Sequence, residues 1–198
     1  MYLCTIMIHI EQGITDMELI EKTCNRRLRY EGPVVKVYED DALMPSGNHA
    51  LRVVVEHPGG VAVAMEDEEG RFFVVTQWRY AQRCLMIEYP AGKREEGEDP
   101  VTTAAREIRE ETGYEGVDFR YLGKMVPTGA YDSEIIHMYA CRKGAYTGQQ
   151  LDKDEYLEVA SMSLDELRDA VMDGGITDAK TIVMTFKLIE LKKQEEKK

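Results

Sequence analysis

The sequence predicts an α+β fold in which helices pack against a mixed β-sheet. Runs of β-branched and aromatic residues fill the first half of the 198-residue chain, and segments bounded by helix-capping residues dominate the second half. Hydrophobic residues make up 43 % and charged residues 31 %, which is typical of a globular protein with a buried core. There is no internal repeat and no low-complexity linker.

Strands are expected where the β-branched runs end at turn residues, such as those at 45–47, 58–60 and 69–70. The two runs that flank the sequence EDEEG should pair as a hairpin, because a short acidic turn ending in glycine joins them. The expected strands are residues 34–41, 51–57, 61–67, 71–79, 118–126 and 134–142.

Capping residues define the helices expected in the second half of the chain. An N-cap side chain accepts a hydrogen bond from the first turn, and a following glycine can end a helix in the left-handed conformation. The expected helices are residues 100–112, between Asp99 and Gly113; a helix opened by the capping box of Ser163 and Glu166 and ended by glycines 174–175; and a helix from Asp178 into the charged tail.

Charge and cysteine usage exclude several classes of protein. The net charge of −12 argues against a nucleic-acid-binding surface, and an anionic substrate would need local arginines or metal ions. Dispersed cysteines without a CxxC pair predict free thiols in a reducing cytosol. No apolar run is long enough to span a bilayer, and residues 1–10 lack the features of a targeting signal. We interpret residues 1–10 as a strand or an upstream extension, and expect a cytoplasmic protein without a membrane partner.

The expected helix at 100–112 has two faces. Small apolar residues recur at helical spacing along one of them, which predicts close packing on a sheet. Glu107, Glu110 and Glu111 share a different face, where like charges destabilise an isolated helix. This face is either a solvated surface or a carboxylate cluster of the kind that Mg²⁺ or Mn²⁺ prefers.

The residues around this helix favour the metal site, because they resemble the signature of the Nudix hydrolase family. Five residues separate Gly92 from Glu98, seven more lead to Arg106, and the sequence REIREETG then ends at Gly113. All seven identities of the signature are present, and the one departure is Tyr114, where the family usually has an aliphatic residue. The resemblance implies a Nudix-type α/β/α sandwich with mixed β-sheets, plus an N-terminal antiparallel β-strand region.

By this resemblance the protein hydrolyses a nucleoside diphosphate linked to another group, with Mg²⁺ or Mn²⁺ as cofactor. Glu107 and Glu111 are then the principal metal ligands, and Glu110 assists them. The backbone carbonyl of Ala91 completes the metal shell, and Glu98 supports it through water.

The resemblance also implies the catalytic residues, which are Glu110, Arg106 and Glu134. Arg106 is expected to orient the carboxylates through charge-assisted hydrogen bonds rather than to touch substrate. Glu134 aligns with a loop glutamate that serves as the base in similar proteins, and Asp132 is the competing candidate. The proline of that loop is shifted here relative to the family pattern. His137 lies in a strand pattern and is interpreted as structural.

Within the family, residues 30–190 resemble the ADP-ribose pyrophosphatase branch, most clearly in QWRYAQRCLMIEYPAG and DGGITDAKT. This similarity implies a homodimer whose N-terminal strands reach the partner's site. Arg79 is the expected contact to substrate phosphates, Arg52 a contact made in trans, and Tyr30 a residue bordering adenine. Arg83 has no clear counterpart in that branch.

The sequence therefore predicts an N-terminal, dimer-forming strand region at 1–56 and a Nudix hydrolase domain at 57–198. The expected reaction splits ADP-ribose or a related nucleoside diphosphate sugar into AMP, or another nucleoside monophosphate, and a sugar phosphate. The alternatives are a GDP-mannose or other nucleotide pyrophosphatase of the family, and a non-catalytic Nudix-like nucleotide sensor.

Overall fold

The computed structural model describes residues 19–197, so the interpretation of residues 1–10 lies outside the described part of the chain. The chain divides into two compact units. Among the described residues, the smaller contains residues 19–57 and 130–133, and the larger contains residues 58–129 and 134–197. Within residues 19–197 no helix has the length and apolar character needed to cross a bilayer.

The smaller unit is an antiparallel sheet of β1 (Lys22–Glu31), β2 (Lys36–Leu43) and β3 (His49–Glu56), in that order. The antiparallel strand region expected at the N-terminus is therefore confirmed. β1 was not expected, because its sequence KTCNRRLRYE is strongly charged. Ion pairs to the neighbouring strand compensate, since Arg26 contacts Asp40 at 2.7 Å and Arg29 contacts Glu39 at 2.7 Å.

The larger unit is built on a seven-stranded sheet in the order β10-β5-β4-β9-β8, with β6 beside β5 and β7 beside β4. β4 and β9 run parallel and the other pairs are antiparallel, so the sheet is mixed as expected. The hairpin expected across the EDEEG turn is confirmed by the pairing of β4 with β5. The strands are β4 (Gly60–Glu66), β5 (Phe72–Arg79), β6 (Cys84–Glu88), β7 (Ala91–Lys93), β8 (Tyr114–Met125), β9 (Ile136–Tyr146) and β10 (Leu157–Met162).

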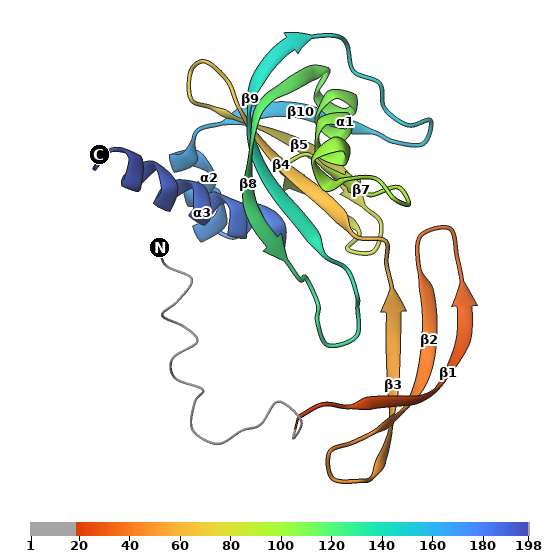
Figure 1. The fold of residues 1–198 in the computed structure, drawn as a ribbon. Helices are drawn as coiled ribbons and strands as arrows, with labels where there is room; N and C mark the ends of the chain where they lie inside the picture. Colours follow the sequence, from red (N-terminus) through yellow and green to blue (C-terminus); the bar gives the residue numbers. More distant parts are fainter. Residues whose placement is uncertain (1–18, 198) are drawn as a thin grey trace. The chain divides into compact units, whose positions relative to one another are not determined.

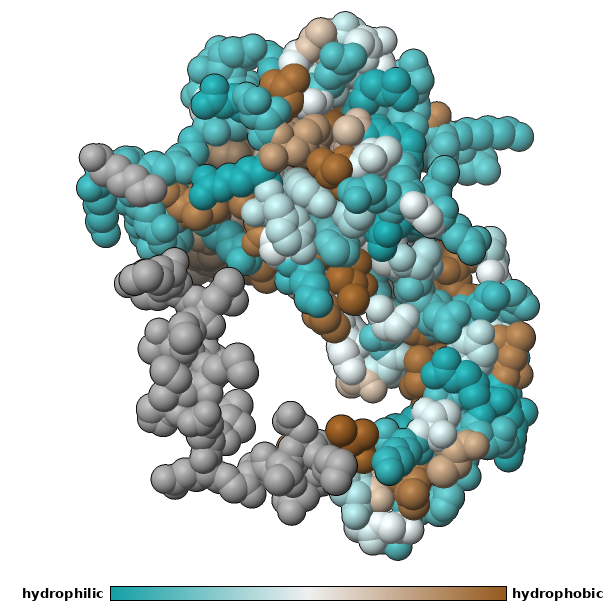
Figure 2. Space-filling model, in the orientation of Figure 1, coloured by the Kyte–Doolittle hydropathy of each residue, from teal (hydrophilic) through white to brown (hydrophobic). Residues whose placement is uncertain are grey.

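Helices cover both faces of this sheet and give the expected α/β/α sandwich (Figure 1). Alternate residues of β4 point to opposite faces. Val61 and Val63 pack with Ile108 of α1 (Pro100–Thr112). On the other face, Ala62 and Ala64 belong to the core formed with α2 (Leu164–Met172) and α3 (Ala179–Glu195). The view in Figure 2 shows a mostly hydrophilic surface over the larger unit, as the net charge of −12 suggests.

The expected caps fix where each helix begins. Asp99 accepts from the Val101 amide at 3.0 Å, and Gly113 ends α1 with φ 77°. The capping box of α2 and the Asp178 N-cap of α3 are both present. Residues 94–99 connect β7 to α1, and the acidic face of α1 lies against β7.

Candidate active site

Glu107 of α1 lies directly over the backbone of Gly92 in β7. A Cβ atom built on Gly92 would lie 1.9 Å from the Glu107 Cδ, 2.0 Å from its Oε1 and 2.2 Å from its Oε2. These distances are far shorter than van der Waals contact, so any side chain at position 92 would displace the carboxylate. Glycine at this position therefore permits the close approach of the carboxylate to the strand.

Replacing Gly92 with alanine is expected to move Glu107 while leaving the fold intact, because the far end of a flexible side chain can yield. The sequence predicts Glu107 as a metal ligand, and on that prediction activity should fall by about tenfold to a hundredfold, since a displaced ligand weakens both metal binding and turnover. Turnover and thermal unfolding of the variant test this. Gly175→Ala is the matched control, because a Cβ there would meet only Ala170 O, at 3.4 Å. Wild-type activity in Gly92→Ala would contradict the assignment of Glu107.

Glu111, one turn further along α1, is 1 % exposed. Its Oε2 accepts from the Ala91 amide at 3.2 Å, whereas its Oε1 is buried with no hydrogen-bond partner. Burial, together with the charges of Glu155 and Glu107, raises the pKa of Glu111 well above its ordinary value. A buried carboxylate oxygen without a partner is costly, so its environment is suited to a positive charge.

Arg106 holds the acidic cluster together from the side. Its Nη1 donates to Glu107 Oε1 at 2.8 Å and to Glu110 Oε2 at 3.0 Å, while its Nη2 donates to Glu98 Oε2 at 3.2 Å. This is the geometry of a residue that orients carboxylates through charge-assisted hydrogen bonds. All of these partners are acidic side chains of the signature.

Glu98 is anchored in the loop before α1. Arg106, chiefly through its hydrogen bonds, lowers the pKa of Glu98 to about 2, and Thr103 Oγ1 donates to its Oε2 at 2.8 Å. Both interactions fix the loop against the helix. Glu98 therefore stays ionised throughout the physiological range.

Arg79 lies at the end of β5. Burial and acidic neighbours raise the pKa of Glu111, and the positive charge of Arg79 offsets part of that rise. Its Nε and Nη2 each donate to Glu88 at 2.6 Å, in a bidentate ion pair. Arg79 is therefore a second cation beside the carboxylates, in addition to Arg106.

Sequence reasoning missed Glu155, which precedes β10. The charge of Glu155 contributes to the raised pKa values of both Glu111 and Glu107, so it lies near the cluster. Two hydrogen bonds hold the loop before β10 against the last turn of α1. Gln149 Nε2 donates to Glu111 O at 2.6 Å, and the Gln150 amide donates to Glu110 O at 2.9 Å. In the sequence LDKDEYLEV nothing distinguishes this acid from its neighbours.

The two candidates for the base from the sequence lie in different units. Asp132 belongs to the smaller unit, where it forms a β-bridge with Val55. Glu134 belongs to the larger unit, and its Oε1 would lie 3.8 Å from a Cβ on Gly60, next to β7. His137 Nδ1 lies 3.2 Å from the Tyr121 hydroxyl, which fits a structural role.

Tyr30 and Arg52 lie in the smaller unit, and their roles at a partner's site stay predictions. Tyr30 is 56 % exposed on β1. Arg52 makes two hydrogen bonds of 2.8 Å to Glu21. Arg83 has φ 54° in the turn between β5 and β6, and its amide donates to Arg79 O at 2.8 Å.

The side chains of the cluster offer carboxylate oxygens, which suit a hard divalent cation. The buried Glu111 oxygen and the close packing of Glu107 on Gly92 both fit such an ion. Among residues 19–197, however, no group of three or more His, Cys, Asp or Glu side chains is already arranged as metal ligands. Glu107 instead points an oxygen at Arg106.

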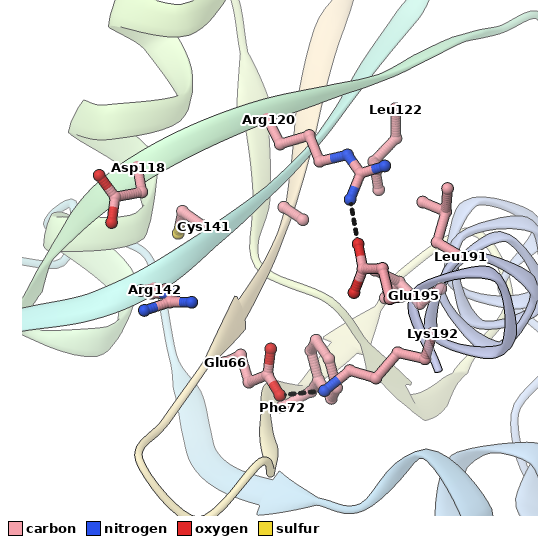
Figure 3. A pocket seen from close by; sticks show the side chains of 12 residues that line it. Glu66, Phe72, Asp118, Arg120, Leu122, Cys141, Arg142, Leu191, Lys192 and Glu195 are labelled. Atoms are coloured by element: carbon pink, nitrogen blue, oxygen red, sulfur yellow. Dashed lines mark hydrogen bonds and ion pairs between the residues drawn. The ribbon is translucent and has the colours of Figure 1, made fainter. Parts of the chain in front are cut away.

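A cavity of about 390 Å³ lies elsewhere in the larger unit, between α3 and strands β8 and β9 (Figure 3). None of the signature residues lines it. Among the residues that line the cavity, Arg120 is paired with Glu195 at 2.7 Å and Lys192 is paired with Glu66. These charges compensate one another. The acidic face of α1 remains the candidate active site.

The chain matches a known family and is similar to characterised proteins. The family model for the NUDIX domain matches residues 56–182. A methanol dehydrogenase activator from Bacillus methanolicus is 37 % identical over 166 residues, which cover 82 % of this chain and 89 % of that protein. An ADP-ribose pyrophosphatase from Bacillus subtilis is 34 % identical over 165 residues, with the same coverage of 82 % and 89 %.

A solved structure described as an ADP compounds hydrolase has the same fold. It superposes with a TM-score of 0.78 at 17 % identity, over 88 % of this chain and 95 % of that one.

Proposed function

This chain belongs to the NUDIX domain family and is a Nudix hydrolase, and from that premise we propose that it hydrolyses the pyrophosphate bond of ADP-ribose or a related nucleoside diphosphate sugar. From ADP-ribose the products would be AMP and ribose 5-phosphate. The observation that carries the proposal is the buried, unpartnered oxygen of Glu111 inside the signature. The substrate class rests on similarity to the ADP-ribose pyrophosphatase.

The proposed cofactor is Mg²⁺ or Mn²⁺, held by Glu107 and Glu111. The Ala91 carbonyl, Glu110 and Glu98 would complete or support the shell. A divalent cation bound there would neutralise the pyrophosphate and polarise the scissile P–O bond.

Other residues of the chain orient these groups and bind substrate. Arg106 keeps the carboxylates in place through its hydrogen bonds. Arg79, on β5, is the proposed contact to a substrate phosphate, since a guanidinium matches phosphate geometry. The burial of Glu111 keeps water from competing for its carboxylate.

Glu134 and Glu155 are the two carboxylates proposed to compete for the role of base. Glu134 is supported by its alignment with the family's loop glutamate. Glu155 is supported by its loop, which is hydrogen-bonded to the last turn of α1, and by the effect of its charge on Glu111 and Glu107; we favour it for these two reasons together. Either would accept a proton from the attacking water.

Glutamine substitutions test which of Glu134 and Glu155 acts as the base. Glu155→Gln is expected to lower kcat by about a hundredfold or more, whereas Glu134→Gln should lower it less than about tenfold. The measurement is kcat for each variant across pH, with folding checked by circular dichroism. The opposite ranking would return the role to Glu134.

A second candidate function is activation of a dehydrogenase, which the 37 % identical activator from Bacillus methanolicus favours. Activation of a dehydrogenase would be compatible with hydrolysis of a pyrophosphate bond by the same carboxylates. A GDP-mannose or other nucleotide pyrophosphatase, and a non-catalytic sensor, are the remaining alternatives. Intact signature glutamates argue against the sensor.

We also propose that the protein is a cytoplasmic homodimer whose subunits associate through residues 1–56. Residues 57–198 would form the catalytic domain. Apolar side chains exposed on the three-stranded sheet support the dimer, because a sheet this small needs cover for stability. They are Leu28, Tyr30, Leu51 and Val53.

The test of function is hydrolysis across a panel with Mg²⁺ and identification of the products. The panel contains ADP-ribose, ADP-glucose, GDP-mannose, diadenosine polyphosphates, NADH and 8-oxo-dGTP. ADP-ribose should be preferred and should give AMP. Preference for ADP-glucose or GDP-mannose would keep the class of nucleoside diphosphate sugars and change the substrate within it. Preference for a diadenosine polyphosphate, NADH or 8-oxo-dGTP would overturn the class. A protein that hydrolyses nothing in the panel but stimulates a dehydrogenase would support the activator function.

A further inference from the structure

A buried chain of charges joins Arg79 to the first turn of α3. Glu88, at the end of β6, accepts both hydrogen bonds from Arg79 and also accepts from Lys180 Nζ. Lys180 Nζ donates in addition to Asp178 Oδ1 at 2.8 Å. Two cations thus alternate with two carboxylates, and the four formal charges cancel.

Burial within this network is uneven. The side chain of Glu88 is 1 % exposed and that of Lys180 is 9 % exposed, whereas that of Arg79 is 39 % exposed. A buried carboxylate is costly unless it is paired. Burial raises the pKa of Glu88, but its contacts with Arg79 and Lys180 outweigh that effect and the pKa lies below its ordinary value. Glu88 is therefore ionised and held by two cations.

The guanidinium of Arg79 has one edge fixed and one edge open. Its Nε and Nη2 are occupied by Glu88. Among the residues that the structure describes, none makes a hydrogen bond or ion pair with its Nη1. The open Nη1 edge is suited to an anion, and because Arg79 also interacts electrostatically with Glu111, an anion bound there would lie beside the carboxylate cluster.

The same network ties α3 to the segment that leads from β6 into β7. Asp178 Oδ2 accepts from the Thr181 amide at 2.9 Å and from its hydroxyl at 2.6 Å. The Thr181 hydroxyl in turn accepts from the Tyr89 amide at 3.0 Å. Tyr89 lies two residues before Ala91, so the start of α3 and the metal-binding segment are linked by hydrogen bonds.

We propose that Glu88 and Lys180 are positioning residues for Arg79. Glu88 fixes the guanidinium, and Lys180 neutralises Glu88 so that the charge of Arg79 remains available to a substrate phosphate at Nη1. This inference rests on the proposed function, because it takes a phosphate of ADP-ribose as the ligand of Arg79. It adds a role for α3, which lies outside the signature.

The test is calorimetric binding of ADP-ribose to the full chain in EDTA, where no turnover occurs. Lys180→Met should weaken binding by about tenfold, because Glu88 then cancels the charge of Arg79. Arg79→Ala should weaken it as well. The Arg79→Ala/Lys180→Met pair should bind no more weakly than Arg79→Ala alone, since Lys180 acts through Arg79.

Lys192→Met is the matched control, because Lys192 is also a paired lysine of α3 but contacts Glu66. Its affinity should equal that of the wild type. In the wild-type background with Mg²⁺, Lys180→Met should raise KM while kcat changes little, a split that a purely structural role would not produce. If Lys180→Met does not fold, the charge-balanced Glu88→Gln/Lys180→Met variant replaces it. Its affinity should fall by less than in Arg79→Ala, because Arg79 keeps its charge but loses one of the two hydrogen bonds that position it.

Unchanged affinity in the folded variants, or additive losses in the double variant, would overturn the inference. Failure of the wild type to bind ADP-ribose would overturn it too. A wild type that binds but does not hydrolyse ADP-ribose would reject the proposed function, and a tenfold loss in Lys180→Met would still support the positioning role.

Discussion

Replacing Glu111 with glutamine is expected to lower turnover by about a thousandfold while leaving the fold intact. Glutamine keeps the shape of the side chain and an oxygen that can accept from the Ala91 amide, now 3.2 Å from Glu111 Oε2. It removes the negative charge that a divalent cation needs. The measurement is kcat with saturating Mg²⁺, compared with Glu190→Gln on α3 as the control. Half the wild-type activity in Glu111→Gln would contradict the role of Glu111.

The same variant should change stability in a direction that depends on pH. Burial and neighbouring charges raise the pKa of Glu111 in the folded protein, so the folded state holds a proton that the unfolded chain releases. Stability of the metal-free wild type should therefore fall as pH rises above the ordinary carboxyl pKa. Relative to wild type, the melting temperature of metal-free Glu111→Gln should rise over that range, and added Mg²⁺ should reduce the difference.

Replacing Arg106 with lysine is expected to lower kcat/KM by about tenfold to a hundredfold. Lysine keeps the charge, but one ammonium group cannot hold three carboxylates in the geometry that the guanidinium gives to Glu98, Glu107 and Glu110. The carboxylates should then spread apart, and a higher Mg²⁺ concentration should be needed for half-maximal activity.

Arg168→Lys provides the control for this substitution. Arg168 of α2 also pairs with two acids, Asp165 at 2.7 Å and Asp169 at 2.8 Å, but these lie on the surface away from the signature. Its replacement should leave activity unchanged. If both lysine variants are fully active, Arg106 does not orient the cluster.

Local sequence signals were sufficient for the helices. The caps at Asp99 and Gly113 gave the bounds of α1 because each satisfies backbone groups within a few residues of itself. The spacing of the acidic residues on α1 likewise depends only on helical geometry. Helical spacing alone therefore predicts that Glu107, Glu110 and Glu111 share one face of α1.

Features that depend on contacts between distant segments were not predictable in this way. β1 is charged and is stabilised by ion pairs to β2, so its own sequence carries no strand pattern. The loop of Glu155 is held beside the last turn of α1 by a hydrogen bond from Gln149 to Glu111, across a separation of 38 residues. The link between Glu88 and Lys180 spans an even longer separation, of 92 residues.

The most direct test of this account is calorimetric titration of the metal-free wild type and Glu111→Gln with Mn²⁺. The wild type should bind Mn²⁺ saturably, because the buried oxygen of Glu111 lacks any other partner. Glu111→Gln should lose most of that affinity. No specific binding by the wild type would show that the acidic face of α1 is not a metal site. Equal binding by the two proteins would show that Glu111 is not a metal ligand.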